Sequence, residues 1–122
     1  FHPGYQGVHR DASGLLGDNV IVVKGDGGEI EINPDTLSHL YGTTGGQSWD
    51  EEWPALSAQR HVKPATLEPE QLKAVWRGDL EDSYPQLALI ATMALALRGL
   101  GHPREQAFEL AQQYWDTRDK SI

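Results

Sequence analysis

The run NVIVVKGDGGEIEINPD, residues 19–35, constrains the fold of this chain more than any other stretch. Its Val20–Val23 block consists of β-branched residues alone, the composition of a fully buried strand. A glycine-rich stretch follows, and residues 29–32 then alternate acidic and apolar side chains, which predicts a second, half-buried strand. Asp26 and Glu29 fall on the turn between these strands, where carboxylates can hold a hard cation. An ordinary hairpin with polar turn residues explains the same pattern, and this stretch alone favours it.

The composition of the chain excludes several classes of function. Its 122 residues are enough for one domain with a modest core. It contains no cysteine, and therefore no disulfide and no thiolate metal site, which fits a cytoplasmic protein. The net charge of −8 argues against nucleic-acid binding by this piece, and no apolar run is long enough to cross a membrane. Because the chain starts at Phe1 rather than at methionine, we expect a fragment or a processed product.

Hydrophobic spacing predicts the other elements of the N-terminal half. A first helix is expected over residues 5–16, ended by Gly17, and a one-turn helix over residues 34–40. Residues 41–63 show no periodicity, so they are expected to form a long loop with at most a short strand near residues 53–56.

The C-terminal half predicts a cluster of helices. An amphipathic helix ends at Gly78, and the SYPQ run at residues 83–86 has the pattern of a capping box. Residues 87–97 are apolar on nearly every side and should form the central buried helix, after which His102-Pro103 begins the last one. The apolar face of that last helix is formed by Ala107, Leu110, Ala111 and Tyr114, flanked by Phe108 and Trp115. The expected fold class is a single α/β domain (an α+β fragment) over residues 1–122, with a helix and strand pair (1–40), a long loop (41–63) and a helical cluster (64–122).

Three separated segments carry a family likeness. The first is HPGYQGVHRDASGLLGDNVIVVKGDGGEIEINPD, the second is LEPEQLKAVWRGDLEDSY, and the third is PQLALIATMALALRGLG with HPREQAFELAQQYWDT. In this order they resemble the C-terminal part of the anthranilate phosphoribosyltransferase family: its helix, strand and acidic turn, its short helix closing in a Gly-acidic loop, and its two final helices. The likeness is above all to the divergent paralogues, often labelled glycosyl transferase family proteins, whose turn reads G-x-x-G-E and runs into Asn-Pro.

The resemblance implies that this chain is the last part of a larger α/β glycosyltransferase domain. In the family's enzymes an N-terminal helical domain makes the homodimer, and a glycine-rich loop upstream of the matched part holds the diphosphate of phosphoribosyl pyrophosphate. The turn after the strand ends in an Asp-Glu pair that binds Mg²⁺ on this substrate. Aligned on the Lys24-Gly25 pair, the first acid falls at Glu29 and the second at Ile30, so one carboxylate is lost. Asp26 is the candidate to replace it.

On this resemblance the isolated chain is expected to be inactive, with the rest of its parent chain as its partner and phosphoribosyl pyrophosphate as the parent's ligand. Two alternatives stay open. One is a parent that has lost the enzyme activity and binds nucleic acid, and the other is a free-standing interaction module. The module predicts no large exposed apolar patch, whereas a fragment exposes the surface that met its parent.

Other motifs predict structure rather than chemistry. The GTTGG run at residues 42–46 lacks the strand before it and the helix after it that a phosphate loop needs, so we interpret it as a flexible linker. The five histidines show no metal-ligand spacing, and none is expected to act as a metal ligand or general base. Trp76, Tyr114 and Trp115 are expected in the core, while Trp49 and Trp53 on the loop are expected to contact a partner.

Overall fold

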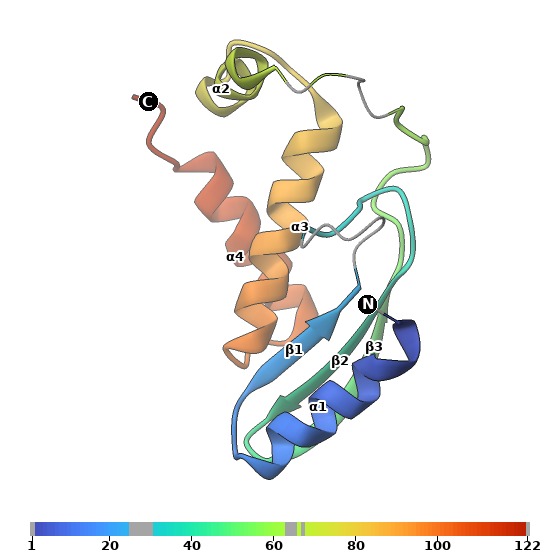
Figure 1. The fold of residues 1–122 in the computed structure, drawn as a ribbon. Helices are drawn as coiled ribbons and strands as arrows, with labels where there is room; N and C mark the ends of the chain where they lie inside the picture. The colour runs from blue at the N-terminus through green and yellow to red at the C-terminus, as the bar shows by residue number, and fades with distance from the viewer. Residues whose placement is uncertain (1, 25–30, 63–65, 67, 122) are drawn as a thin grey trace.

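The computed structural model describes residues 2–24, 31–62, 66 and 68–121. Over these residues the chain forms a small α+β domain with one three-stranded antiparallel sheet (Figure 1). Its elements in chain order are the 3-10 turn η1 (Pro3–Tyr5), α1 (Gln6–Leu15), β1 (Val20–Val23), β2 (Ser38–Thr44), β3 (Gln47–Trp53), α2 (Pro69–Arg77), α3 (Ser83–Gly99) and α4 (Arg104–Asp116).

The central strand of the sheet is β2, which pairs with β1 along one edge and with β3 along the other. The strand expected over residues 29–32 is not found at Glu31 and Ile32, so over the described residues Val20–Val23 pairs with β2 alone. Glu29 and its neighbour Ile30 lie outside the described residues. The β1 strand itself is confirmed, but it is half-buried rather than fully buried. The reason is that β1 is an edge strand within the described part of the chain, so β2 covers one side of it only.

A tight hairpin of β2 and β3 occupies residues that we expected to form a one-turn helix (34–40) and a long loop (41–63), so both predictions are wrong. Gly45 and Gly46 form the turn between the strands, with φ of 58° and 78°. Positive φ at both positions gives the turn whose twist matches that of the flanking strands, and it strongly favours glycine. The GTTGG run is thus the end of a strand and its turn, not a linker.

The inward-facing side chains of β3 explain why the sequence pattern did not predict this strand. Trp49, Glu51 and Trp53 are at least half-buried, while Ser48, Asp50 and Glu52 are exposed. A charged residue among the inward set hides the apolar–polar alternation that marks a half-buried strand. Its burial is possible because Arg98 from α3 pairs with Glu51 at 2.7 Å.

The helices α1, α3 and α4 lie in two layers, one on each face of the sheet, while α2 contacts α3. On one face, Gly14 of α1 lies against Thr43, and Arg10 of α1 pairs with Asp50. On the other face, Gly99 of α3 lies against Ile21, which stands opposite Gly42 in the strand register. Since neighbouring residues of a strand point to opposite faces, α1 forms one outer layer and α3 with α4 the other.

The core lies between the sheet and the α3–α4 layer, as the apolar run at residues 87–97 predicts. It comprises Leu40, Trp53, Val75, Ile90, Ala94, Ala107, Ala111 and Trp115. Three expectations about aromatic residues change. Trp53 is buried in this core and not available to a partner, Trp49 packs within its own chain, and Tyr114 is exposed rather than part of the core.

The predicted helix ends agree with the structure, with one correction. The α1 helix ends just before Gly17, and α2 ends at Gly78, whose φ of 85° terminates the helix in the left-handed conformation. The capping residue of α3 is not Ser83 but Asp82, whose Oδ1 accepts the Tyr84 N–H at 3.2 Å. Ser83 is instead the first residue of the helix.

The orientation of α1 is unusual for an amphipathic helix. Its apolar stripe, defined here as Tyr5, Val8, Ala12, Leu15 and Leu16, is exposed to solvent. Leu15 and Leu16 are 90% and 78% exposed. The side that faces the sheet carries Gln6, Arg10 and Gly14 instead. A helix normally buries its apolar stripe, so this stripe is unpartnered over the described residues.

Candidate functional site

The two residues proposed as metal ligands, Asp26 and Glu29, lie outside the described residues. Within the described part of the chain, no group of three or more His, Asp or Glu side chains is placed to hold a metal ion. The described polar groups gather elsewhere, in a network that joins three segments far apart in the sequence.

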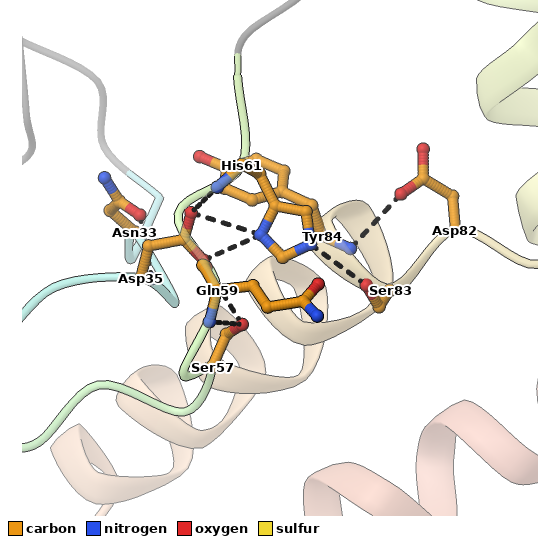
Figure 2. A network of polar contacts seen from close by, with 8 residues as sticks. All are labelled: Asn33, Asp35, Ser57, Gln59, His61, Asp82, Ser83 and Tyr84. Carbon is orange, nitrogen blue, oxygen red and sulfur yellow. Dashed lines mark hydrogen bonds and ion pairs between the residues drawn. The ribbon is translucent and has the colours of Figure 1, made fainter.

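This network is centred on His61 (Figure 2). The backbone N–H of His61 donates to Asp35 Oδ2 at 2.6 Å, and its ring Nδ1 lies 2.9 Å from Asp35 Oδ1. On the other side of the ring, Nε2 lies 3.1 Å from Ser83 Oγ. In a neutral imidazole, Nδ1 would donate to the carboxylate and Nε2 would accept the serine hydroxyl. The Tyr84 ring packs against the imidazole, with ring centres 5.3 Å apart.

Local turns hold each member of the network in place. Asn33 Oδ1 accepts the backbone N–H of Asp35 at 3.0 Å, which fixes the turn after the sequence pair Asn33-Pro34. Ser57 Oγ accepts the N–H of Gln59 at 3.1 Å and shapes the segment that leads to His61. The N-terminus of α3 fixes Ser83.

The Asp35 carboxylate stays ionised at neutral pH. Its side chain is only 5% exposed, and burial by itself raises the pKa. Hydrogen bonds from the backbone and ring of His61 outweigh this effect, so the pKa of Asp35 lies below its ordinary value. Asp35 thus fixes the ring of His61 and the tautomer that hydrogen-bonds to Ser83.

The order of atoms is that of a Ser–His–Asp relay, in which the base activates a serine nucleophile. Hydrolytic catalysis also needs donors for an oxyanion and a cavity for the substrate. In the first turn of α3 the Tyr84 N–H is already bonded to Asp82, and Pro85 has no N–H. The groove described below is lined by none of the three relay residues. The network therefore acts best as a clasp that ties residues 33–36 and 57–61 to the start of α3.

A groove of about 480 Å³ lies between β1 and the C-terminal end of α3. It is mainly apolar and lined by Asn19, Val20, Ile21, Thr92, Leu95, Ala96, Gly99 and Leu100. One of these lining residues, Leu100, is 78% exposed. The β1 residues that line the groove are Val20 and Ile21, and over the described residues β1 pairs with β2 alone.

Sequence reasoning missed both features for the same reason. The three relay residues are separated by more than 20 positions each, and no spacing rule joins them. The only local signals are the turn-forming Asn33-Pro34 pair and the helix start at residues 82–83. The groove depends on how α3 lies across β1, which no local pattern encodes.

Comparison with known proteins adds no assignment: no protein-family model matches this chain, and no curated protein matches it. In the described part of the chain, no helix is both long enough and apolar enough to cross a membrane.

Proposed function

We propose that this chain is the C-terminal portion of a phosphoribosyltransferase-like glycosyltransferase domain. The parent would transfer a pentosyl group from phosphoribosyl pyrophosphate with the help of Mg²⁺. The class of reaction rests on the family likeness of the three quoted segments. In support, a helix and a strand come first and three helices come last, the order that the likeness implies.

The observation that carries the proposal is the exposed apolar stripe of α1. Soluble monomers rarely leave a contiguous apolar surface exposed unless a partner covers it. A free-standing module would turn this stripe toward its core, whereas part of a larger domain leaves it free for neighbouring elements. The stripe includes Leu15 and Leu16, whose side chains are almost fully exposed.

In the proposed reaction, a nucleophilic nitrogen attacks the anomeric carbon of the ribose, and pyrophosphate leaves with the bonding electrons. The protein contributes mainly by positioning the reactants and neutralising charge through Mg²⁺. By resemblance, Glu29 is the residue of this chain assigned to the metal, with Asp26 as a weaker associate. A Mg²⁺ site needs only one or two carboxylates when phosphate oxygens complete it, so the loss of the second acid at Ile30 weakens the site without removing it.

The rival proposal is a non-enzymatic parent that binds nucleic acid. Several cations of this piece already have partners within the chain, which disfavours such a role here. Arg98 lies over the Trp49 ring and pairs with Glu51, and Arg118 lies over the Trp115 ring at 3.6 Å from its centre. If the rival holds, the phosphate-binding surface lies in another part of the parent.

The deciding experiment is a calorimetric titration of phosphoribosyl pyrophosphate with Mg²⁺ into the longer parent protein. We expect Mg²⁺-dependent binding that Glu29→Ala weakens about tenfold, since one of few metal-facing carboxylates is lost. Glu31→Ala, two positions along, is the matched control and should leave binding unchanged. Absence of binding at millimolar ligand would refute the transferase proposal and favour the rival.

A further inference from the structure

The α2 helix is the peripheral helix of the described chain. It lies at the end of the molecule opposite α1 (Figure 1). Among the described elements, its backbone comes close to that of α3 alone. One of its side chains is buried, that of Val75, which is 4% exposed and belongs to the core. A helix that buries so little of its surface opens more easily than the rest of a domain unless other contacts hold it.

A single guanidinium group, that of Arg118, joins the C-terminal ends of α2 and α4. Its Nε donates to the carbonyl oxygen of Trp76 at 2.6 Å, and its Nη1 donates to the carbonyl oxygen of Trp115 at 2.6 Å. The last carbonyl groups of an α-helix have no partner within the helix, and they carry a partial negative charge. Two such helix ends repel each other, and Arg118 places a full positive charge between them.

The rings of the same two tryptophans hold the guanidinium from the side. Arg118 lies 3.6 Å from the centre of the Trp115 ring and 5.7 Å from that of Trp76, and the two rings meet edge to face. A cation is attracted to the face of an aromatic ring. The chain after Arg118 is bound to α2 as well, because Trp76 Nε1 donates to the carbonyl oxygen of Asp119 at 2.7 Å. Asp119 Oδ1 in turn accepts the Ser121 N–H at 2.8 Å.

We propose that residues 117–121 form a strap that holds α2 on the domain, with Arg118 as its fastening, and that α2 opens as a unit when the strap is released. Opening withdraws Val75 from the core and uncovers the ring of Trp115. The sheet and the α3–α4 pair keep their own contacts and stay folded. The proposal is independent of the proposed function, because it uses only contacts within this chain.

Hydrogen–deuterium exchange of Arg118→Met tests the proposal on the present chain. We expect the amides of α2 to exchange about tenfold faster or more, because hydrogen bonds from a charged group to the helix end are lost. The amides of α3 and β2 should exchange as in the native protein. Lys120→Met is the matched control: it removes the same charge from the same segment, and its ammonium makes none of the contacts above. It should leave exchange in α2 unchanged.

Two results for Arg118→Met would overturn the proposal. Unchanged exchange in α2 would show that the strap does not hold the helix. Equal acceleration in α2, α3 and β2 would show that Arg118 stabilises the whole domain and that α2 does not open separately.

Trp76→Phe decides the question if Arg118→Met does not fold. It keeps an aromatic ring beside Trp115 and the carbonyl groups that Arg118 binds, but it removes the indole donor to Asp119. We expect the amides of α2 to exchange about threefold faster, the effect of one lost hydrogen bond, with no change in β2. The absence of any acceleration in α2 would overturn the proposal.

Discussion

The indole ring of Trp49 lies directly against Gly42, its cross-strand partner in β2. The guanidinium of Arg98 lies over the same ring, 3.9 Å from its centre, and Trp49 Nε1 donates to Thr44 Oγ1 at 3.0 Å. The ring can occupy this place only because residue 42 has no side chain. The contact links the hairpin to α3.

Gly42→Ala should destabilise the protein. A Cβ at residue 42 would overlap the Trp49 ring, so the ring must move and lose its contact with Arg98. We expect a loss of about 1–3 kcal/mol in the free energy of unfolding, measured by urea denaturation. Gly7→Ala in α1 is the control, because a Cβ there meets no close neighbour and should stabilise the helix slightly. An unchanged stability of Gly42→Ala would show that the ring lies elsewhere.

Arg98→Met should also destabilise, because it leaves the half-buried Glu51 with fewer donors. Burial raises the pKa of Glu51, but hydrogen bonds from Arg98 and Trp53 outweigh this and hold the pKa below its ordinary value. We expect a loss of about 1–3 kcal/mol at pH 7. A carboxylate whose pKa is lowered by folding stabilises the folded state at pH values above the ordinary glutamate pKa of about 4.3. This stabilisation is lost as the pH falls below that value. The deficit of Arg98→Met, followed by circular dichroism in urea, should therefore shrink in acid.

Asp35→Asn should lower the stability of the folded protein at neutral pH, because it weakens the clasp, and should lower it less in acid. The pKa of Asp35 is lowered in the folded state, so its carboxylate stabilises the fold above the ordinary aspartate value of about 3.9, and this contribution disappears as the pH falls below it. We expect the urea midpoints of the variant and the native protein to differ at pH 7 and to converge near pH 3. Asp79→Asn, at an exposed position, is the control and should show no such convergence.

Ser83 should not behave as a catalytic nucleophile, despite its place beside His61. A fluorophosphonate probe should label Ser83 no faster than the exposed Ser48, because the neighbouring Tyr84 N–H already donates to Asp82, Pro85 has no N–H, and the apolar groove is lined by none of the three relay residues. Ser83→Ala should cost about 1 kcal/mol or less. Selective labelling of Ser83 that His61→Gln abolishes would contradict this reading and identify an active site.

Leu15→Lys should affect the stability of the present chain and that of its proposed parent differently. In the isolated chain we expect a change within about 0.5 kcal/mol, because Leu15 is exposed. In the parent we expect a loss of about 1.5–3 kcal/mol, because the leucine would be buried there. Gln113→Lys on α4 is the control, with a small effect in both proteins. A small effect of Leu15→Lys in the parent would mean that nothing covers the stripe.

The sequence predicted α1, β1, α2, α3 and α4 because their signals are local. Gly17 and Gly78 mark helix ends, and the apolar run at residues 87–97 marks a buried helix whatever packs around it. The sequence did not predict the β2–β3 hairpin, because its inward positions carry Gly42 and Glu51, which are unusual residues for a buried face. Both become favourable only when Trp49 and Arg98 are in place.

The sequence alone thus determined where most helices begin and end, and the acidic, cysteine-free character of the chain, because propensity, spacing and charge act over a few residues. Only the tertiary structure decided which strand pairs with β1, that the apolar stripe of α1 faces solvent, and that Asp35, His61 and Ser83 meet. The strand pairing and the meeting of Asp35, His61 and Ser83 depend on contacts between residues 17 or more positions apart. Such contacts form only when the whole chain packs, and no local pattern encodes them.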